Sequence, residues 1–170
     1  MDTPRIGFAR TLARRTLKEC RLTGPPVPIE EVLRFYGLAL VRVPGDPAWS
    51  GSLQGDRVIV NAGHPDTRQR FTAAHELGHF RLAHWAPEEG IGNRMARHAA
   101  HALREEVDAD RMRIREIEAN AFAAELLALR AWVKAYYRKL WSPSKMASVF
   151  LLSQESMWLA CLQAGCIKVR

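Results

Sequence analysis

The sequence predicts an α+β fold in which a small sheet of about three strands packs on a mostly helical body. Two observations lead to this prediction. Apolar residues recur at helical spacing through residues 5–36 and again from residue 67 almost to the end of the chain. Residues 38–61, in contrast, consist of short β-type segments with no βαβ repeat. We expect a single domain of 170 residues, with its core in residues 27–130 and a C-terminal helical segment in residues 131–170.

The first two helices are predicted from their periodicity and their end signals. Residues 5–20 place alanine, leucine and isoleucine side chains on one face and basic side chains on the other. Residues 23–26, Thr-Gly-Pro-Pro, interrupt this helix. Pro28 suits the start of a second helix, and Gly37 suits its end.

The β region contains three short segments, residues 38–43, 49–54 and 57–61. Gly55-Asp56 separates the last two and is a turn pair typical of a tight hairpin. A strand with a free edge can bind an extended peptide by main-chain pairing. We assign that role to the strand around residues 58–61.

The remaining chain is predicted to be helical. Its elements are the helix beginning near residue 67, a loop at 87–92, a charged helix at 93–115, an apolar stretch at 117–129, a helix at 131–140, and two short helices joined by a tight turn at 153–155. Ser142-Pro143 marks the start of the first short helix, since proline is tolerated in a first helical turn.

Composition bears on the compartment of the protein and on its partners. No apolar run reaches the length of a signal peptide or a membrane span, so we expect a cytoplasmic protein without membrane contact. Three cysteines without CxxC spacing argue against a disulfide framework. The net charge is +7, but 20 of the 25 basic residues are arginines scattered along the whole chain. Charge alone therefore gives little support to direct binding of nucleic acid.

A HExxH motif at His75, Glu76 and His79 lies within a helical stretch. Residues four apart on a helix are rotated by roughly 40° and separated by about 6 Å along the axis, so the two histidines share one face. Two imidazoles in this arrangement bind zinc, and Glu76 lies beside the metal, where it can take a proton from zinc-bound water. The motif thus predicts a metallopeptidase active site.

A catalytic zinc needs a third protein ligand. The glycine and histidine of the metzincin pattern are missing, because Leu82 and Trp85 occupy their places. Two histidines and a later glutamate remain as the ligand set. Glu118 is the best candidate, since it shares the inward face of its helix with Phe122 and an inward carboxylate must be paired or bound to metal. Glu116 is the alternative ligand.

Two neighbouring side chains are assigned supporting or packing roles. Asn120 could support the site through a hydrogen bond, or it could serve helix packing. His84 lies off the metal-facing side of the motif helix, so we expect it to pack or to hydrogen-bond near the end of that helix.

Three segments of the chain together resemble the ImmA/IrrE metallopeptidase family. They are Val-Ile-Val-Asn at residues 58–61, the stretch at 68–79 that contains the HExxH motif, and Glu-Ile-Glu-Ala-Asn with the apolar residues that follow at 116–127. The resemblance extends over about residues 27–130. One departure is Ala128-Leu129, where the family usually has Met-Pro.

The resemblance implies a zincin-like active-site helix and a zinc-dependent endopeptidase, with one Zn²⁺ ion or Mn²⁺ in its place. It implies His75, His79 and Glu118 as metal ligands and Glu76 as the general base. It also implies a protein substrate, a helix-turn-helix transcriptional repressor, whose cleavage derepresses mobile-element or stress genes.

The sequence is also compatible with two other interpretations. Residues 146–163 have the spacing of a helix-turn-helix, which would suit a regulatory module that binds DNA or a partner without proteolysis. The presumed recognition helix, residues 154–163, contains no arginine or lysine, which argues against DNA binding. A purely structural zinc site would need a fourth protein ligand, and the sequence offers no convincing one.

Overall fold

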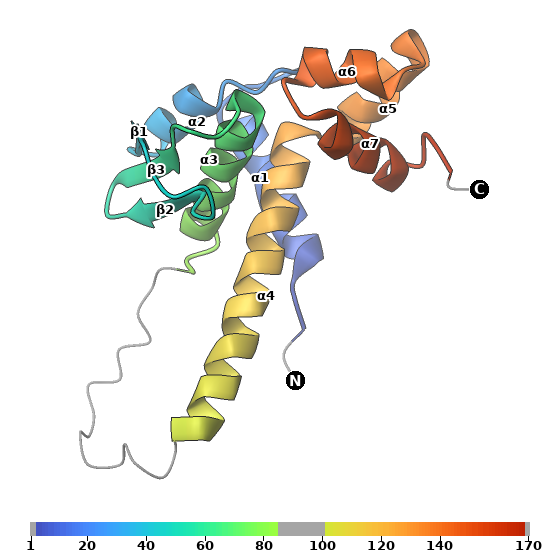
Figure 1. The fold of residues 1–170 in the computed structure, drawn as a ribbon. Helices are drawn as coiled ribbons and strands as arrows, with labels where there is room; N and C mark the ends of the chain where they lie inside the picture. Colours follow the sequence, from blue (N-terminus) through green and yellow to red (C-terminus); the bar gives the residue numbers. More distant parts are fainter. Residues whose placement is uncertain (1–2, 85–100, 169–170) are drawn as a thin grey trace.

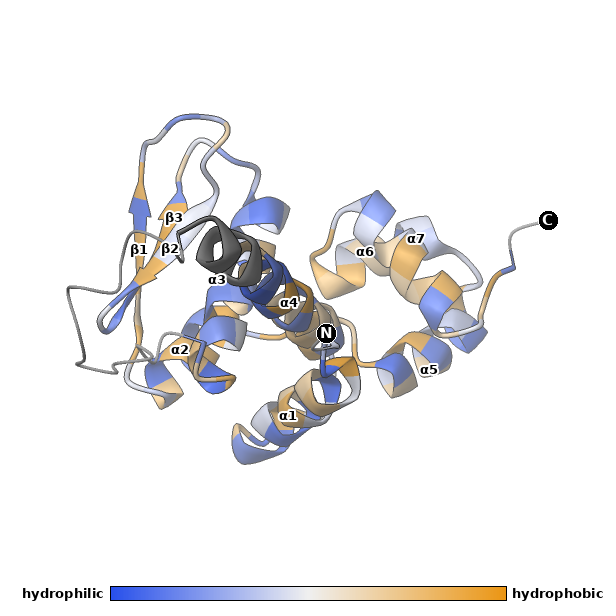
Figure 2. Ribbon diagram, turned by 90° about the horizontal axis from the view of Figure 1, so that it is seen from below, coloured by the Kyte–Doolittle hydropathy of each residue, from blue (hydrophilic) through white to orange (hydrophobic). Residues whose placement is uncertain are grey.

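The computed structural model describes residues 3–84 and 101–168, with the backbone alone for residues 101–108. Within these residues a three-stranded sheet and α2 lie on one side of a long helix, α4, and α5–α7 lie on the other (Figures 1 and 2). The elements are α1 Ile6–Glu19, α2 Ile29–Phe35, β1 Ala39–Val43, β2 Gly51–Gln54, β3 Arg57–Asn61, α3 Asp66–Arg81, α4 His101–Leu127, α5 Arg130–Leu140, α6 Pro143–Phe150 and α7 Gln154–Gln163. The predicted α+β class with about three strands is confirmed.

The sheet has the order β1-β3-β2, with β1 parallel and β2 antiparallel to β3. The predicted hairpin is confirmed, and Gly55 turns it with a φ of 59°, in the left-handed region that favours glycine. The expectation that residues 58–61 pair with a substrate is wrong. These residues belong to β3, the central strand, whose two edges are both occupied. The strand that borders the candidate site is β2.

The motif helix α3 lies between the sheet and α4, and α4 also packs against α1 (Figure 2). Gly78 lets α3 and α4 approach closely, since a Cβ at this position would lie 3.1 Å from the carbonyl oxygen of Ala119. Leu77 on α3 and Phe122 and Leu126 on α4 are fully buried at this contact. The HExxH residues are thus held against α4 by an apolar core.

The predicted C-terminal helices are present, but the turn predicted at residues 153–155 lies at residues 151–153, because Ser153 caps a helix that already begins at Gln154. Ser142 and Ser153 precede α6 and α7, and the side chain of each accepts a hydrogen bond from a backbone N–H in the first turn. Trp141 and Leu151 adopt left-handed conformations at the two intervening turns. The charged and apolar stretches predicted around residues 93–129 form one continuous helix, α4, in the part that is described. The predicted loop at 87–92 and the start of the charged stretch lie outside the described residues.

Among the residues that the structure describes, no helix combines the length and the apolar character needed to cross a membrane.

The packing of β2 on α3 can be tested at Gly51. A Cβ there would lie 2.5 Å from the carbonyl oxygen of Ile59 and 2.5 Å from Cγ2 of Thr72. Gly51→Ala should therefore push β2 away from its neighbours and lower the free energy of unfolding by about 1–3 kcal/mol, as overpacking does. Urea unfolding followed by circular dichroism measures this change.

Gly7→Ala is the matched control, because nothing lies within 4 Å of a Cβ at Gly7 on α1. Because alanine is the better helix former, the free energy of unfolding of Gly7→Ala should be unchanged or higher by up to about 1 kcal/mol. Equal stability of the two variants would contradict the close packing of β2 on α3.

Candidate metal centre

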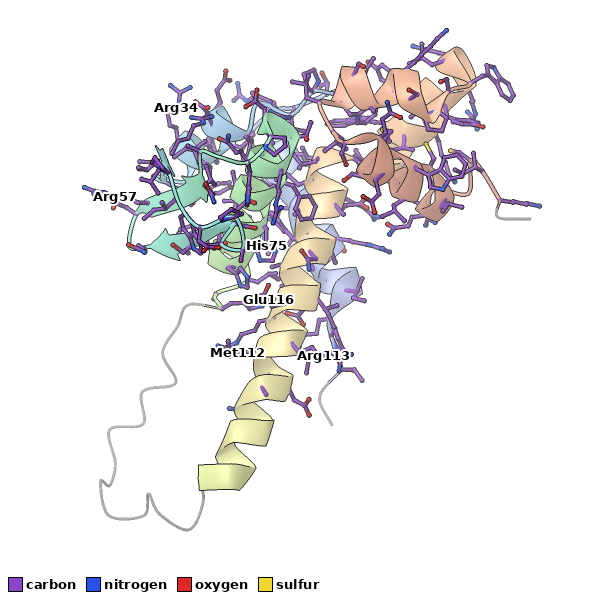
Figure 3. The ribbon with its side chains drawn as sticks, in the orientation of Figure 1. Arg34, Arg57, His75, Met112, Arg113 and Glu116 are labelled. Atoms are coloured by element: carbon purple, nitrogen blue, oxygen red, sulfur yellow. The ribbon has the colours of Figure 1, made fainter. Side chains whose placement is uncertain are left out.

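Four acceptor atoms from α3 and α4 converge on one point. The Nε2 atoms of His75 and His79 lie 2.9 Å apart. The carboxylate of Glu116 lies against both, with one oxygen 3.2 Å from Nε2 of His75 and the other 3.1 Å from Nε2 of His79. Figure 3 shows His75 and Glu116 side by side where the two helices meet. These three side chains form the one group in the described residues with ligand atoms spaced to hold a metal ion.

A hydrogen bond at Nδ1 of His75 fixes the tautomer of its imidazole ring. Its Nδ1 lies 2.9 Å from Oδ1 of Asn120, one turn beyond Glu116 on α4. A carbonyl oxygen only accepts hydrogen bonds, so Nδ1 of His75 carries the proton and Nε2 is left with a lone pair. The supporting role considered for Asn120 is therefore the one that its contact favours.

A chain of hydrogen bonds fixes His79 in the same way. Nε2 of His84 lies 3.0 Å from the carboxylate of Glu118 and must donate to it. In a neutral imidazole Nδ1 is then an acceptor, and Nδ1 of His84 lies 3.1 Å from Nδ1 of His79. His79 therefore donates from Nδ1 and keeps a lone pair on Nε2. The left-handed conformation of Ala83, with a φ of 56°, turns the chain back so that His84 reaches His79.

Electrostatics favour the neutral forms of His79 and His84. Burial, and then the neighbouring His75, lower the pKa of His79 to about 4. Burial also lowers the pKa of His84, against the opposing effect of Glu118. The carboxylate of Glu116 faces the Nε2 lone pairs of His75 and His79. These electron-rich atoms repel one another unless a cation lies among them. Nitrogen and oxygen donors of this kind suit zinc, so the residues present fit the metal that the sequence predicts.

The structure does not bring Glu118 to this point. Its side chain is buried, and its two oxygens accept hydrogen bonds from the backbone N–H, Nε and Nη2 of Arg5 and from Nε2 of His84. Burial raises the pKa of Glu118, but the hydrogen bonds from Arg5 outweigh this and hold it below its usual range. Four donors occupy the lone-pair positions of this carboxylate, which leaves none for a metal.

Glu116, the alternative ligand of the sequence analysis, occupies the place predicted for Glu118. Its side chain is 55% exposed, so the cluster is open toward solvent on this side. Glu116 and Asn120 are four residues apart and share the face of α4 toward the histidines, whereas Glu118 is turned toward α1.

Glu76 lies beside the cluster in a cleft of about 680 Å³ that His75, His79 and Glu116 also line. Burial, and then the charge of Glu116, raise the pKa of Glu76 to about 7, while a backbone hydrogen bond from Leu53 acts in the opposite direction. Leu53 belongs to β2, so the edge of the sheet orients the carboxylate. A buried carboxylate next to a candidate metal site suits a general base.

The opposite wall of the cleft is formed by the segment before β2, residues 48–50, and by β2 itself. Asn61, at the end of β3, holds this segment in place. Its side-chain amide donates to the carbonyl oxygens of Asp46 and Trp49, at 2.9 Å each, and its Oδ1 accepts from the backbone N–H of Gly63. No sequence pattern predicts this role of Asn61, because contacts of a loop with a strand leave no periodic signal in the sequence.

Comparisons with known proteins bear on the family and the fold of the chain. A family profile described as the IrrE N-terminal-like domain, Peptidase M78, matches residues 33–157. A solved structure, a Mycobacterium tuberculosis transcriptional regulator, is similar to the chain with a TM-score of 0.61 and 15% sequence identity over 89% of this chain. The chain spans 45% of the length of that structure, and at this identity the likeness concerns the fold. No curated protein gives a significant match.

The two glutamates on α4 can be distinguished by exchanging each for glutamine. Glu116→Gln should lower zinc affinity by more than about 100-fold, beyond the 10- to 100-fold typical of residues that only support a ligand. The stability of its metal-free form should hardly change, because Glu116 is exposed. Glu118→Gln should destabilise the metal-free protein by about 1–3 kcal/mol, because a buried charged acceptor of four hydrogen bonds is lost.

Competition with a zinc chelator measures the affinity, and thermal unfolding measures the stability. The reverse pattern, in which zinc affinity depends on Glu118 more than on Glu116, would restore the assignment made from the sequence.

Proposed function

The chain belongs to the IrrE N-terminal-like family, Peptidase M78, whose profile covers residues 33–157, and from this premise we propose that it is a zinc-dependent endopeptidase that cleaves a protein partner. The family supports a metallopeptidase role. The observation that carries the proposal for this chain is the convergence of His75, His79 and Glu116 next to the buried Glu76.

The three converging side chains would hold one zinc ion, with manganese as a possible substitute. When bound, the metal would act as a Lewis acid on water and on the carbonyl group of the substrate. Asn120 and His84 orient the imidazoles from behind, as such supporting hydrogen bonds do in other metal sites.

Glu76 is the proposed general base and acid. Its carboxylate takes the proton of the attacking water and later gives it to the leaving amine. The hydrogen bond from the backbone of Leu53 keeps this carboxylate turned toward the cleft. Within the described residues the outer edge of β2 is unpaired, and an extended peptide would bind along it by main-chain pairing, with its scissile bond next to Glu76.

The proposed substrate is a helix-turn-helix transcriptional repressor, cut in the cytoplasm to derepress mobile-element or stress genes. This part of the proposal is supported by the family resemblance of the three sequence segments. It is also supported by the description of the similar solved structure as a transcriptional regulator.

A non-proteolytic regulatory module is the second candidate. The turn between α6 and α7 at residues 151–153 has helix-turn-helix spacing, but Met157 and Cys161 of α7 are buried and the helix carries no basic side chain. Salt-dependent DNA binding that persists after zinc removal would favour this candidate.

Glu76→Gln tests the proposed mechanism. The exchange keeps the shape of the side chain and removes the proton acceptor, so zinc binding should persist while cleavage of a candidate helix-turn-helix repressor falls by about 10²- to 10⁴-fold. Gel electrophoresis of the repressor after incubation with zinc-loaded protein measures cleavage.

Glu31→Gln is the matched control, since Glu31 is exposed on α2, and it should cleave at the parent rate. Cleavage by Glu76→Gln at the parent rate would disprove the mechanism. Failure of the parent to cut the repressor, together with cleavage of a mixed peptide library, would retain the peptidase and reject this substrate.

A further inference from the structure

A second cavity lies on the other side of the α3–α4 contact from the metal cluster. It has a volume of about 400 Å³ and is bounded by α1, α4 and α7, and we call it the α1/α7 groove. Its floor is a row of residues at helical spacing, from Ile117 through Ala121 and Ala124 on α4 to Ala128 just after its end. At 1.5 Å per residue this row extends for about 16 Å, or three helical turns.

The walls of the groove expose large apolar side chains to solvent. Ile6 on α1 is 37% exposed and Leu159 on α7 is 50% exposed, and both line the groove. The helices that carry them lie on different sides of the end of α4 (Figure 2). Exposed apolar residues gathered at a concave surface mark interaction sites more often than scattered ones do.

The rim of the groove is basic. Arg14 forms an ion pair of 2.7 Å with the buried Glu125, and a guanidinium nitrogen of Arg130 donates to the carbonyl oxygen of Gln163. The side chain of Arg10, one turn after Ile6 on α1, has no hydrogen-bond or ion-pair partner among the described residues. The rim thus carries three positive charges and one negative charge, with Arg10 available to an anionic partner.

The shape of the groove selects a helix as its occupant. Its boundaries are helices, so there is no strand edge to satisfy the main chain of an extended peptide, whereas a helix satisfies its own backbone groups. Alanines on the floor allow the helix axes to approach to about 8–10 Å. A helix of three turns would cover the exposed Ile6 and Leu159 and would complete a layer between α1 and α7.

Charge selects the chemistry of that helix. The chain has a net charge of +7, so a second copy would meet the basic rim with like charge. A helix with short aliphatic residues on its inner face and aspartate or glutamate along the edge that meets Arg10 is complementary. We propose that the α1/α7 groove is a docking site for an acidic amphipathic helix of a partner protein. This proposal does not depend on peptidase activity.

A designed peptide provides the probe. It has 18 residues, with leucine and alanine on one face, glutamate along one edge and blocked termini, and a second peptide carries lysine in place of glutamate. Binding is followed by fluorescence anisotropy with the full chain carrying Glu76→Gln, so that cleavage does not consume the probe. The acidic peptide should bind in the micromolar range and the basic peptide at least about tenfold more weakly.

Two pairs of variants locate the binding. Arg10→Glu should weaken binding of the acidic peptide by about tenfold, whereas Arg57→Glu at the start of β3, on the side of the molecule away from α7 (Figure 3), should change it by less than about twofold. Ala124→Trp fills the floor and should abolish binding, whereas Ala135→Trp on the exposed side of α5 should leave it intact.

Circular dichroism of each variant confirms that it is folded, so a loss of binding can be assigned to the groove. Equal binding of the two peptides, or binding that withstands both Arg10→Glu and Ala124→Trp, would overturn the proposal. It would also be overturned if ultracentrifugation showed the chain associating with itself through this groove.

Discussion

The buried carboxylate of Glu118 connects three elements that are far apart in the sequence. It accepts hydrogen bonds from Arg5, at the start of α1, and from His84, just after α3, while it belongs to α4. An ionised carboxylate inside a protein is tolerated only when such donors surround it. Because His84 in turn orients His79, the position of α1 and the tautomer of a proposed metal ligand depend on the same charged group.

Much of the fold could be predicted because its signals are local. The hairpin at Gly55, the serine caps of α6 and α7 and the HExxH helix each depend on residues within a few positions of one another. The strand order could not be predicted from such local signals. β2 lies between β1 and β3 in the sequence, but in the sheet β1 pairs directly with β3. Nothing in the sequence of β3 indicates that both of its edges are paired.

The third proposed ligand shows where reasoning from burial fails. An inward-facing carboxylate must be paired or bound to metal, and for Glu118 the sequence predicts metal binding. The actual partner, Arg5, lies 113 residues away in the chain, and no sequence pattern announces it. A proposed active site has to be open to solvent to admit a substrate, and Glu116, the carboxylate that meets the histidines, is accordingly 55% exposed. Helical spacing is nevertheless informative, since Glu116 and Asn120 are one turn apart and therefore share the face of α4 that meets the histidines.

Phe71 and Asn120 line both the cleft of the metal cluster and the α1/α7 groove, so the partition between the two cavities is only one side chain thick there. Asn120 also holds the ring of His75. Any occupant of the groove that shifts Asn120 changes how well the imidazole is aligned, and thermodynamic linkage requires the effect to be reciprocal. A metal ion at the histidines would then alter the affinity of the groove by the same factor by which the occupant alters the affinity for the metal.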